Sequence, residues 1–166
     1  MAGYVIGVDL GGTKILTALA NLQGEIIAKE RLATEADQGE KEVINRILTT
    51  IDRVLASSDL TTEEIEAVAV GAPGPLNVEE GIIYHAPNLG WKDVNLKQLL
   101  ESRLEIPVFI ENDANAAALG SKWFGAGQNK NNLIYVTIST GIGSGIIIDN
   151  KLYHGASDSA GEVGHM

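Results

Sequence analysis

Residues 8–15 read VDLGGTKI, in which an apolar run ends in aspartate and leads directly into two glycines, a threonine and a lysine. Paired glycines between two apolar runs are a common hairpin signal, so the stretch predicts a tight turn between two strands. The same residues suit phosphate binding. Gly11 and Gly12 would let backbone N–H groups approach phosphate oxygens. Thr13 adds a hydroxyl and Lys14 a positive charge. Taken alone, the stretch leaves both interpretations open.

The pattern on either side of this turn predicts an α/β fold with a mixed sheet. Three short apolar runs joined by tight turns indicate an antiparallel meander, and a strongly amphipathic helix follows at 40–56. The expected strands are Tyr4–Leu10, Ile15–Ala20, Glu25–Ala33, Ile65–Val70, Val108–Ile110, Leu133–Ile138 and Gly145–Ile148. The expected helices are Glu40–Ala56, Asn95–Leu104 and a small-residue helix that Asn112 and Asp113 open and that runs through Ala118.

A second glycine turn, STGIGS, separates the last two expected strands. Ser139, Thr140 and Ser144 alternate there with Gly141, Gly143 and Gly145, so this turn could also hold phosphate. Neither turn is a Walker motif or a dinucleotide fingerprint, because a strand and not a helix follows each. Two such hairpins could hold a nucleotide phosphate chain from opposite sides.

This repeat of strand, glycine turn and strand suggests two related domains. The segment Gly125–Asn132, GAGQNKNN, has the composition of a linker near their boundary. We therefore expect one domain at residues 1–120 and the start of a second at residues 121–166.

Three polar residues follow the strand expected at 108–110. They are Glu111, Asn112 and Asp113, and the helix that Asn112 and Asp113 open continues mostly with alanine. Ligands of α/β folds bind beyond the carboxyl ends of strands, so a carboxylate here could accept a proton from a substrate hydroxyl. The positive end of the helix would keep that carboxylate ionised. Asn112 would offer a donor and an acceptor to a polyhydroxylated ligand. Asp113 could equally be only the helix cap.

Three further segments carry polar residues within turns. GEVGHM at the end of the chain contains Glu162 and His165, which could bind sugar hydroxyls, ligate a metal, or have no role beyond the surface. Metal ligation would need partners that this chain lacks. The segments GAPGPL (71–76) and HAPNLGW (85–91) are each expected to be plain loops, with Trp91 used for packing.

Composition excludes several classes of protein. The chain has 166 residues, a formal net charge of −10 and no cysteine. The negative charge argues against nucleic acid as a partner, and without cysteine neither disulfides nor thiolate metal sites can form. No basic leader is present, and no apolar run approaches the roughly 18 residues that span a bilayer. We expect a cytoplasmic protein without a membrane partner.

The ordered set VDLGGTK, GAPGPL, PNLGW, ENDANAAALG, STGIGSGIIIDNKLYHGA and AGEVGH resembles the ROK family of bacterial sugar kinases and related repressors, which belongs to the actin-like ATPase superfamily. The resemblance runs from Tyr4 to His165 and is strongest to the glucokinases. It implies two α/β domains that close on a cleft, with a hexose and Mg·ATP bound between them. A homo-oligomer is expected for the full-length protein.

The resemblance also implies roles for individual residues. Asp113 matches the catalytic base that acts on the sugar 6-hydroxyl. Hexose binding is implied for Asn112, Asp113, Glu162 and His165, with weaker support for Gly71, Pro73 and Asn88. Nucleotide binding is implied for Asp9, Gly11, Gly12, Thr13, Lys14, Ser139, Thr140, Gly141 and Gly143. In many family members the histidine at the position of His165 also ligates a structural zinc, together with cysteines from a later segment. Family chains continue well past residue 166, so the chain alone is expected to be inactive.

The function expected from these residues is ATP-dependent transfer of the γ-phosphate to the 6-hydroxyl of a hexose, with glucose as the first candidate. Two alternatives stay open: a sugar-responsive transcriptional repressor, and a truncated sugar-binding module without activity. Such repressors carry a helix-turn-helix domain before the first strand, whereas the first strand here begins at Tyr4. The sequence does not decide between hexoses, or between ATP and polyphosphate as donor.

Overall fold

The computed structural model describes residues 3–138 and 141–165 and divides the chain into two compact units. The first unit is Met1–Glu111 and the second unit is Asn112–Met166. Among the described residues, the first unit contains two sheets and the second unit contains one.

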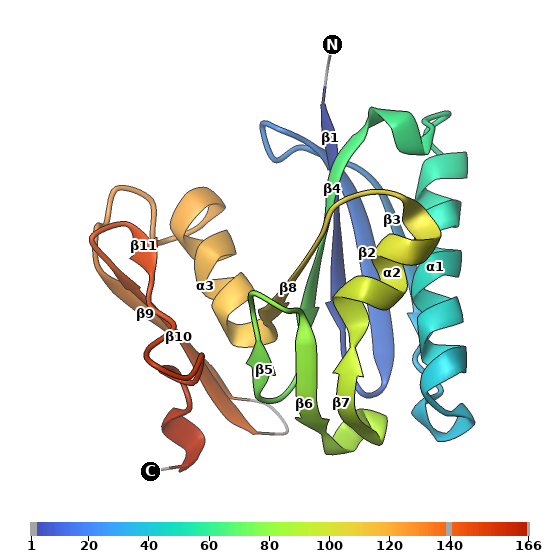
Figure 1. Cartoon of the computed structure of the whole chain (residues 1–166). Coiled ribbons are helices and arrows are strands. Elements are labelled where there is room, and N and C mark those ends of the chain that lie inside the picture. The colour runs from blue at the N-terminus through green and yellow to red at the C-terminus, as the bar shows by residue number, and fades with distance from the viewer. Residues whose placement is uncertain (1–2, 139–140, 166) are drawn as a thin grey trace. The chain divides into compact units, whose positions relative to one another are not determined.

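A five-stranded sheet forms the centre of the first unit, with strand order β3-β2-β1-β4-β8 (Figure 1). Its strands are β1 (Tyr4–Leu10), β2 (Lys14–Asn21), β3 (Ile26–Ala33), β4 (Ile65–Ala72) and β8 (Val108–Asn112). The first three form an antiparallel meander, while β1 and β4 run parallel. This confirms the predicted α/β fold with a mixed sheet.

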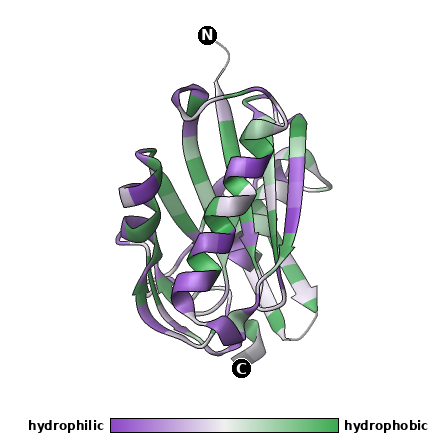
Figure 2. Ribbon diagram, turned by 90° about the vertical axis from the view of Figure 1, so that its right-hand side faces the viewer, coloured by the Kyte–Doolittle hydropathy of each residue, from purple (hydrophilic) through white to green (hydrophobic). Residues whose placement is uncertain are grey.

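The helix α1 (Glu40–Ala56) packs on β2 and β3 and begins and ends where the periodicity predicts. Its hydrophobic residues recur at helical spacing and form one buried face, while polar residues occupy the other face (Figure 2). Two buried threonines meet within this layer, where the Thr17 and Thr50 hydroxyl oxygens lie 2.6 Å apart. Burying each large apolar side chain contributes about 1.5–3 kcal/mol, so this face is a major source of the unit's stability.

A second, three-stranded sheet corrects the prediction that 71–76 and 85–91 are plain loops. It consists of β5 (Leu76–Asn77), β6 (Ile82–Ala86) and β7 (Trp91–Asn95), paired antiparallel. Trp91 is buried and packs in the core, as expected. Gly81 and Gly90 have positive φ in the connections, a conformation that glycine adopts without strain. The helix α2 (Leu96–Leu104) follows, and the Asn95 side chain caps it.

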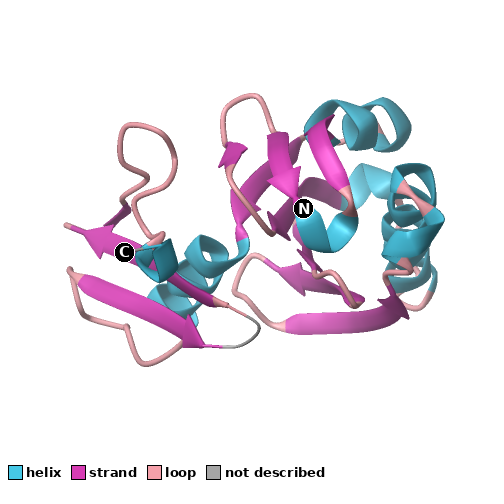
Figure 3. Ribbon diagram, turned by 90° about the horizontal axis from the view of Figure 1, so that it is seen from below, coloured by secondary structure: helices cyan, strands magenta, loops and turns pink. Residues whose placement is uncertain are grey.

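The second unit has its own antiparallel sheet, of order β11-β10-β9, with α3 packed against β9 and β10 (Figure 3). These elements are α3 (Asp113–Phe124), β9 (Leu133–Ile138), β10 (Ile142–Ile148) and β11 (Lys151–Leu152). Two boundaries differ from the prediction. The helix runs six residues past Ala118, and β10 begins at Ile142 and not at the expected Gly145, so Gly143 and Ser144 lie in the strand and not in the turn.

Close packing of α3 explains both strand glycines. A Cβ added at Gly145 would lie 2.6 Å from the Ala118 Cβ and 2.7 Å from the Ala114 carbonyl oxygen. One added at Gly143 would lie 3.3 Å from the Ala114 Cβ. Alanines on the helix and glycines on the strand therefore let the two backbones approach closely. Because α3 packs on these strands, the second compact unit begins at Asn112, before the helix, whereas the expected second domain begins at residue 121.

Four short 3₁₀ helices complete the described elements: η1 (Ala36–Gln38), η2 (Thr62–Glu64), η3 (Pro87–Leu89) and η4 (Val163–His165). Among the described residues, no helix has both the length and the apolar character needed to cross a bilayer.

Candidate functional site

Residues 8–15, VDLGGTKI, form the end of β1, a hairpin turn and the start of β2. Leu10 pairs with Ile15, and the Gly11 N–H donates to the Lys14 carbonyl oxygen at 2.9 Å. Neither turn glycine has a positive φ, so left-handed backbone is not why glycine stands there. The Thr13 and Lys14 side chains are exposed. A hydroxyl, an ammonium group and glycine backbone together provide donors that suit a phosphate chain.

Close approach of another segment explains the second turn glycine. A Cβ added at Gly12 would lie 2.7 Å from the Asn88 Cβ and 3.1 Å from the Asn88 carbonyl oxygen. Asn88 is exposed and belongs to η3. The first unit therefore brings a predicted sugar-binding residue, Asn88, beside a predicted phosphate-binding turn.

Asp9 and Gly71 also lie side by side in the first unit. The parallel register of β1 and β4 pairs these two residues, near the ends of their strands. Asp9 is exposed, on the face of β1 opposite its buried hydrophobic residues. Pro73 directly follows β4. The predicted nucleotide-binding and sugar-binding positions of this unit thus gather around the β1–β2 turn, the end of β4 and η3.

A buried threonine, Thr34, was not predicted from the sequence and forms hydrogen bonds to the β1–β2 turn. Thr34 is fully buried, its hydroxyl donates to the Gly11 carbonyl oxygen at 2.6 Å, and its N–H donates to the Thr13 carbonyl oxygen at 2.9 Å. No sequence pattern marks this residue, because a threonine after a strand is common and its partners lie more than twenty positions earlier.

At the start of α3, the structure decides which residue caps the helix. The Asn112 Oδ1 accepts hydrogen bonds from the Ala114 N–H at 3.0 Å and the Asn115 N–H at 3.3 Å, so Asn112 is the N-cap. Asp113 is the first helical residue, exposed, and accepts the Ala114 N–H at 2.7 Å. The interpretation of Asp113 as the cap is therefore wrong, since the neighbouring amide fills that role.

The segment Ala160–His165 docks on β10. The Ser144 N–H and the Ser144 hydroxyl both donate to the Gly161 carbonyl oxygen, at 3.1 Å and 2.8 Å. Ser144 is buried, so its hydroxyl binds this segment of the chain and does not bind a phosphate. Glu162 lies between Gly161 and Gly164, both of which have β10 atoms where a Cβ would stand. The second unit thus places Glu162 and the η4 residue His165 beside the glycine-rich strand.

The structure describes only some of the predicted positions in the second glycine turn and at the end of the chain. Ser139 and Thr140 lie outside the described residues, and Gly141 directly precedes β10. Within the described residues, no three histidine, cysteine, aspartate or glutamate side chains gather into a group that could hold a metal ion. The side chain of the predicted zinc ligand His165 lies outside the described part of the chain, so its assignment stays a prediction.

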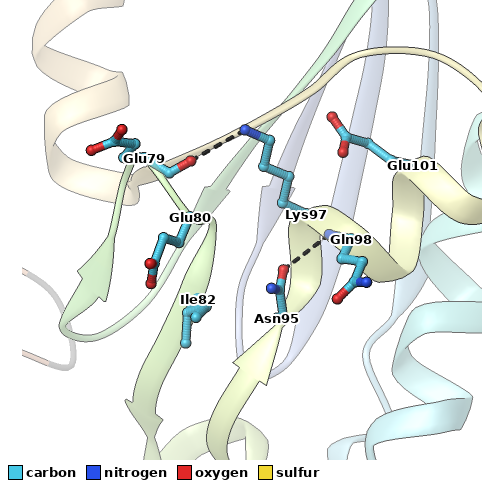
Figure 4. Close-up of a pocket in the computed structure, with 7 residues that line it drawn as sticks. All are labelled: Glu79, Glu80, Ile82, Asn95, Lys97, Gln98 and Glu101. Carbon is cyan, nitrogen blue, oxygen red and sulfur yellow. Dashed lines mark hydrogen bonds between the residues drawn. The ribbon is translucent and has the colours of Figure 1, made fainter.

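A hollow of about 380 Å³ lies elsewhere in the first unit, next to the start of α2 (Figure 4). The Lys97 Nζ donates to the Glu79 carbonyl oxygen at 3.2 Å, and the Asn95 Oδ1 accepts the Gln98 N–H at 3.0 Å. None of the predicted site residues lines it. These hydrogen bonds cap α2 and join it to the turn before β6, which indicates a structural role.

Comparison with known proteins extends this picture. The ROK family profile matches residues 5–166. A glucokinase of Halalkalibacterium halodurans is 38% identical over 98% of this chain and 49% of its own length. A xylose repressor of Caldicellulosiruptor bescii is 39% identical over 98% of this chain and 41% of its own length. The chain thus spans about half the length of the curated relatives it matches.

Solved structures agree with the family match. A ROK family glucokinase from Streptomyces griseus in complex with glucose and AMPPNP superposes with a TM-score of 0.89 at 38% identity, over 99% of this chain and 50% of that one. A ROK hexokinase from Thermus thermophilus superposes with a TM-score of 0.87 at 35% identity, over 98% and 53% of the two chains.

Proposed function

The chain belongs to the ROK family, and from this premise we propose that it is the N-terminal part of an ATP-dependent sugar kinase. The proposed reaction transfers the γ-phosphate of ATP to the 6-hydroxyl of a hexose. Glucose is the first candidate, because two of the similar proteins are glucokinases and one of them was solved with glucose and AMPPNP. A cytoplasmic location and a homo-oligomer for the full-length protein are parts of the same proposal.

The observation that carries the proposal is the position of Asp113. An exposed carboxylate stands at the first position of a helix whose capping bonds are made by Asn112. Asp113 would accept the proton of the 6-hydroxyl as the hydroxyl oxygen bonds to the γ-phosphorus and the bond to the bridging oxygen breaks. The Ala114 N–H, which bonds the carboxylate at 2.7 Å, would hold it in place for this transfer.

Nucleotide binding is assigned to the two glycine-rich hairpins. Bound Mg·ATP would supply the phosphoryl group and the charge-neutralising cation. The Thr13 hydroxyl and the Lys14 ammonium would donate to phosphate oxygens, with Gly11 and Gly12 allowing close approach of the backbone. Asp9 would orient a water molecule of the magnesium shell. From the second hairpin we assign Ser139, Thr140, Gly141 and Gly143 to the phosphate chain.

Hexose binding is assigned to residues of both units. Asn112 would donate through its amide Nδ2, since its Oδ1 accepts two backbone N–H groups. Glu162 would accept from sugar hydroxyls and His165 would donate to them. Gly71, Pro73 and Asn88 would complete the sugar site. This assignment requires the two domains, proposed at residues 1–120 and 121–166, to close on one cleft. A structural zinc at His165 would need cysteines that this chain does not contain.

A repressor is the second candidate, because the xylose repressor is as similar to this chain as the glucokinase is. The negative net charge of −10 argues against DNA binding by the residues of this chain themselves. Sequence identity does not separate the two functions, so the decision needs an activity measurement.

A coupled assay for ADP across a panel of hexoses tests the proposal, using the complete native polypeptide that contains this chain. We expect turnover with glucose and ATP at about 1–100 s⁻¹, the usual range for kinases. Polyphosphate in place of ATP tests the donor. Sugar-dependent binding of double-stranded DNA without phosphorylation of any hexose would instead establish the repressor.

Replacing Gly12 with alanine is expected to lower kcat/KM for Mg·ATP by about 10- to 100-fold, since displacements near 1 Å cost about that much. The added Cβ would stand 2.7 Å from the Asn88 Cβ, so the turn or η3 must move. Steady-state kinetics measure the loss. Gly120→Ala is the matched control, because a Cβ there meets nothing within 4 Å. Unchanged nucleotide kinetics in Gly12→Ala would remove this turn from the nucleotide site.

A further inference from the structure

We propose that Thr34 is a positioning residue for nucleotide binding, because it aims the backbone of the turn at residues 11–14. The inference rests on the proposed function, since it presumes that this turn holds the phosphate chain. Thr34 itself would not touch the nucleotide. It acts by fixing one peptide group of the turn.

Two hydrogen bonds attach Thr34 to the turn. Its hydroxyl donates to the Gly11 carbonyl oxygen at 2.6 Å, and its N–H donates to the Thr13 carbonyl oxygen at 2.9 Å. The Thr34 donor is fully buried, with 0% exposed, while the acceptor residue Gly11 is half-buried. Partial shielding from water makes the hydroxyl bond electrostatically stronger than one at the surface.

The direction of the Gly12 N–H follows from the first of these bonds. In a trans peptide the carbonyl of one residue and the N–H of the next point in opposite directions within one plane. Holding the Gly11 carbonyl toward Thr34 therefore turns the Gly12 N–H away from Thr34. This is the donor that a glycine-lined phosphate turn presents to its ligand. The second bond, from the Thr34 N–H to the Thr13 carbonyl oxygen, joins the turn to the residue that follows β3. It limits rotation of the tip of the turn.

The Thr17–Thr50 pair shows what a purely structural hydroxyl looks like in this unit. Both threonines are fully buried, and their hydroxyl oxygens lie 2.6 Å apart between β2 and α1. The Thr50 hydroxyl donates to the Ile47 carbonyl oxygen at 2.7 Å, within the helix. Neither makes a hydrogen bond to the turn. Thr50→Val is therefore a matched control for Thr34→Val. Both substitutions remove the hydroxyl of a fully buried threonine, but only Thr34 bonds the turn.

The test compares Thr34→Val, Thr34→Ser and Thr50→Val in the complete native polypeptide, measuring KM for Mg·ATP, KM for glucose, kcat and the melting temperature. Thr34→Val replaces the hydroxyl by a methyl group of similar size, and Thr34→Ser keeps the hydroxyl. We expect Thr34→Val to raise KM for Mg·ATP about tenfold. This factor corresponds to the loss of one hydrogen bond, here the bond from the Gly12 N–H to the phosphate chain. KM for glucose is expected to stay within about twofold.

Thr34→Ser is expected to restore the nucleotide KM to near the wild-type value, and Thr50→Val to lower the melting temperature without raising that KM. If Thr34→Val does not fold, Thr34→Ala is compared with Thr34→Ser in its place. Equal nucleotide KM in all variants of an active kinase would overturn the inference and leave the proposed function intact. A wild-type polypeptide that phosphorylates no hexose would overturn the proposed function, and with it this role for Thr34.

Discussion

Asp113→Asn is expected to lower kcat for glucose phosphorylation by about 100- to 10,000-fold, the usual contribution of a general base. Asparagine has nearly the same shape and its carbonyl oxygen can still accept the Ala114 N–H, so the helix start is preserved. What is lost is the ability to take up the proton of the 6-hydroxyl. KM for glucose is expected to change by less than about threefold, because the group acts mainly in the transition state.

Asp52→Asn is the matched control for this substitution. Asp52 is an exposed carboxylate on α1, outside all the predicted site positions, and we expect its replacement to leave kcat unchanged. Circular dichroism and melting temperature establish that both variants fold. If Asp113→Asn retained near-wild-type kcat, Asp113 would be no general base and its place at the start of α3 would be only structural.

Gly145→Ala is expected to destabilise the second unit by about 1–3 kcal/mol, the cost of overpacking a close contact. The added methyl group would lie 2.6 Å from the Ala118 Cβ, 2.7 Å from the Ala114 carbonyl oxygen and 3.0 Å from the Asn115 Cα. All three atoms belong to α3, so the helix must move away from β10. Since α3 also carries Asp113, this movement should lower kcat/KM as well.

Hydrogen exchange of the α3 and β10 amides, together with thermal unfolding, measures this effect. A loss of 1 kcal/mol corresponds to a drop of roughly 4–8 °C for a small domain. Gly120→Ala is the same substitution on α3 itself, at a position where a Cβ meets nothing within 4 Å. It is expected to raise stability slightly, because alanine favours helix over glycine by about 1 kcal/mol. Equal melting temperatures for the two variants would contradict the packing argument.

Elements with a strong local pattern were predicted well. The bounds of α1 and β9 match the expectation because periodicity and turn residues define them within a short window. The small sheet of β5, β6 and β7 was missed, since its strands are two to five residues long and are separated by short connections that contain proline and glycine. The start of β10 was placed too late, because Gly143 and Ser144 have the composition of a turn.

The order of motifs along the chain, and the family that this order resembles, were determined by the sequence alone. So were the hairpin at residues 11–14 and a polar helix start at 112–113, because glycine pairs and a strand-to-helix transition are local signals. Only the tertiary structure decided what those residues contact. It assigned the cap to Asn112, brought Asn88 against Gly12, turned the Ser144 hydroxyl toward Gly161 and placed Thr34 behind the turn. The last three contacts join segments 17 or more residues apart, and such pairings form only when the packing of whole elements brings them together.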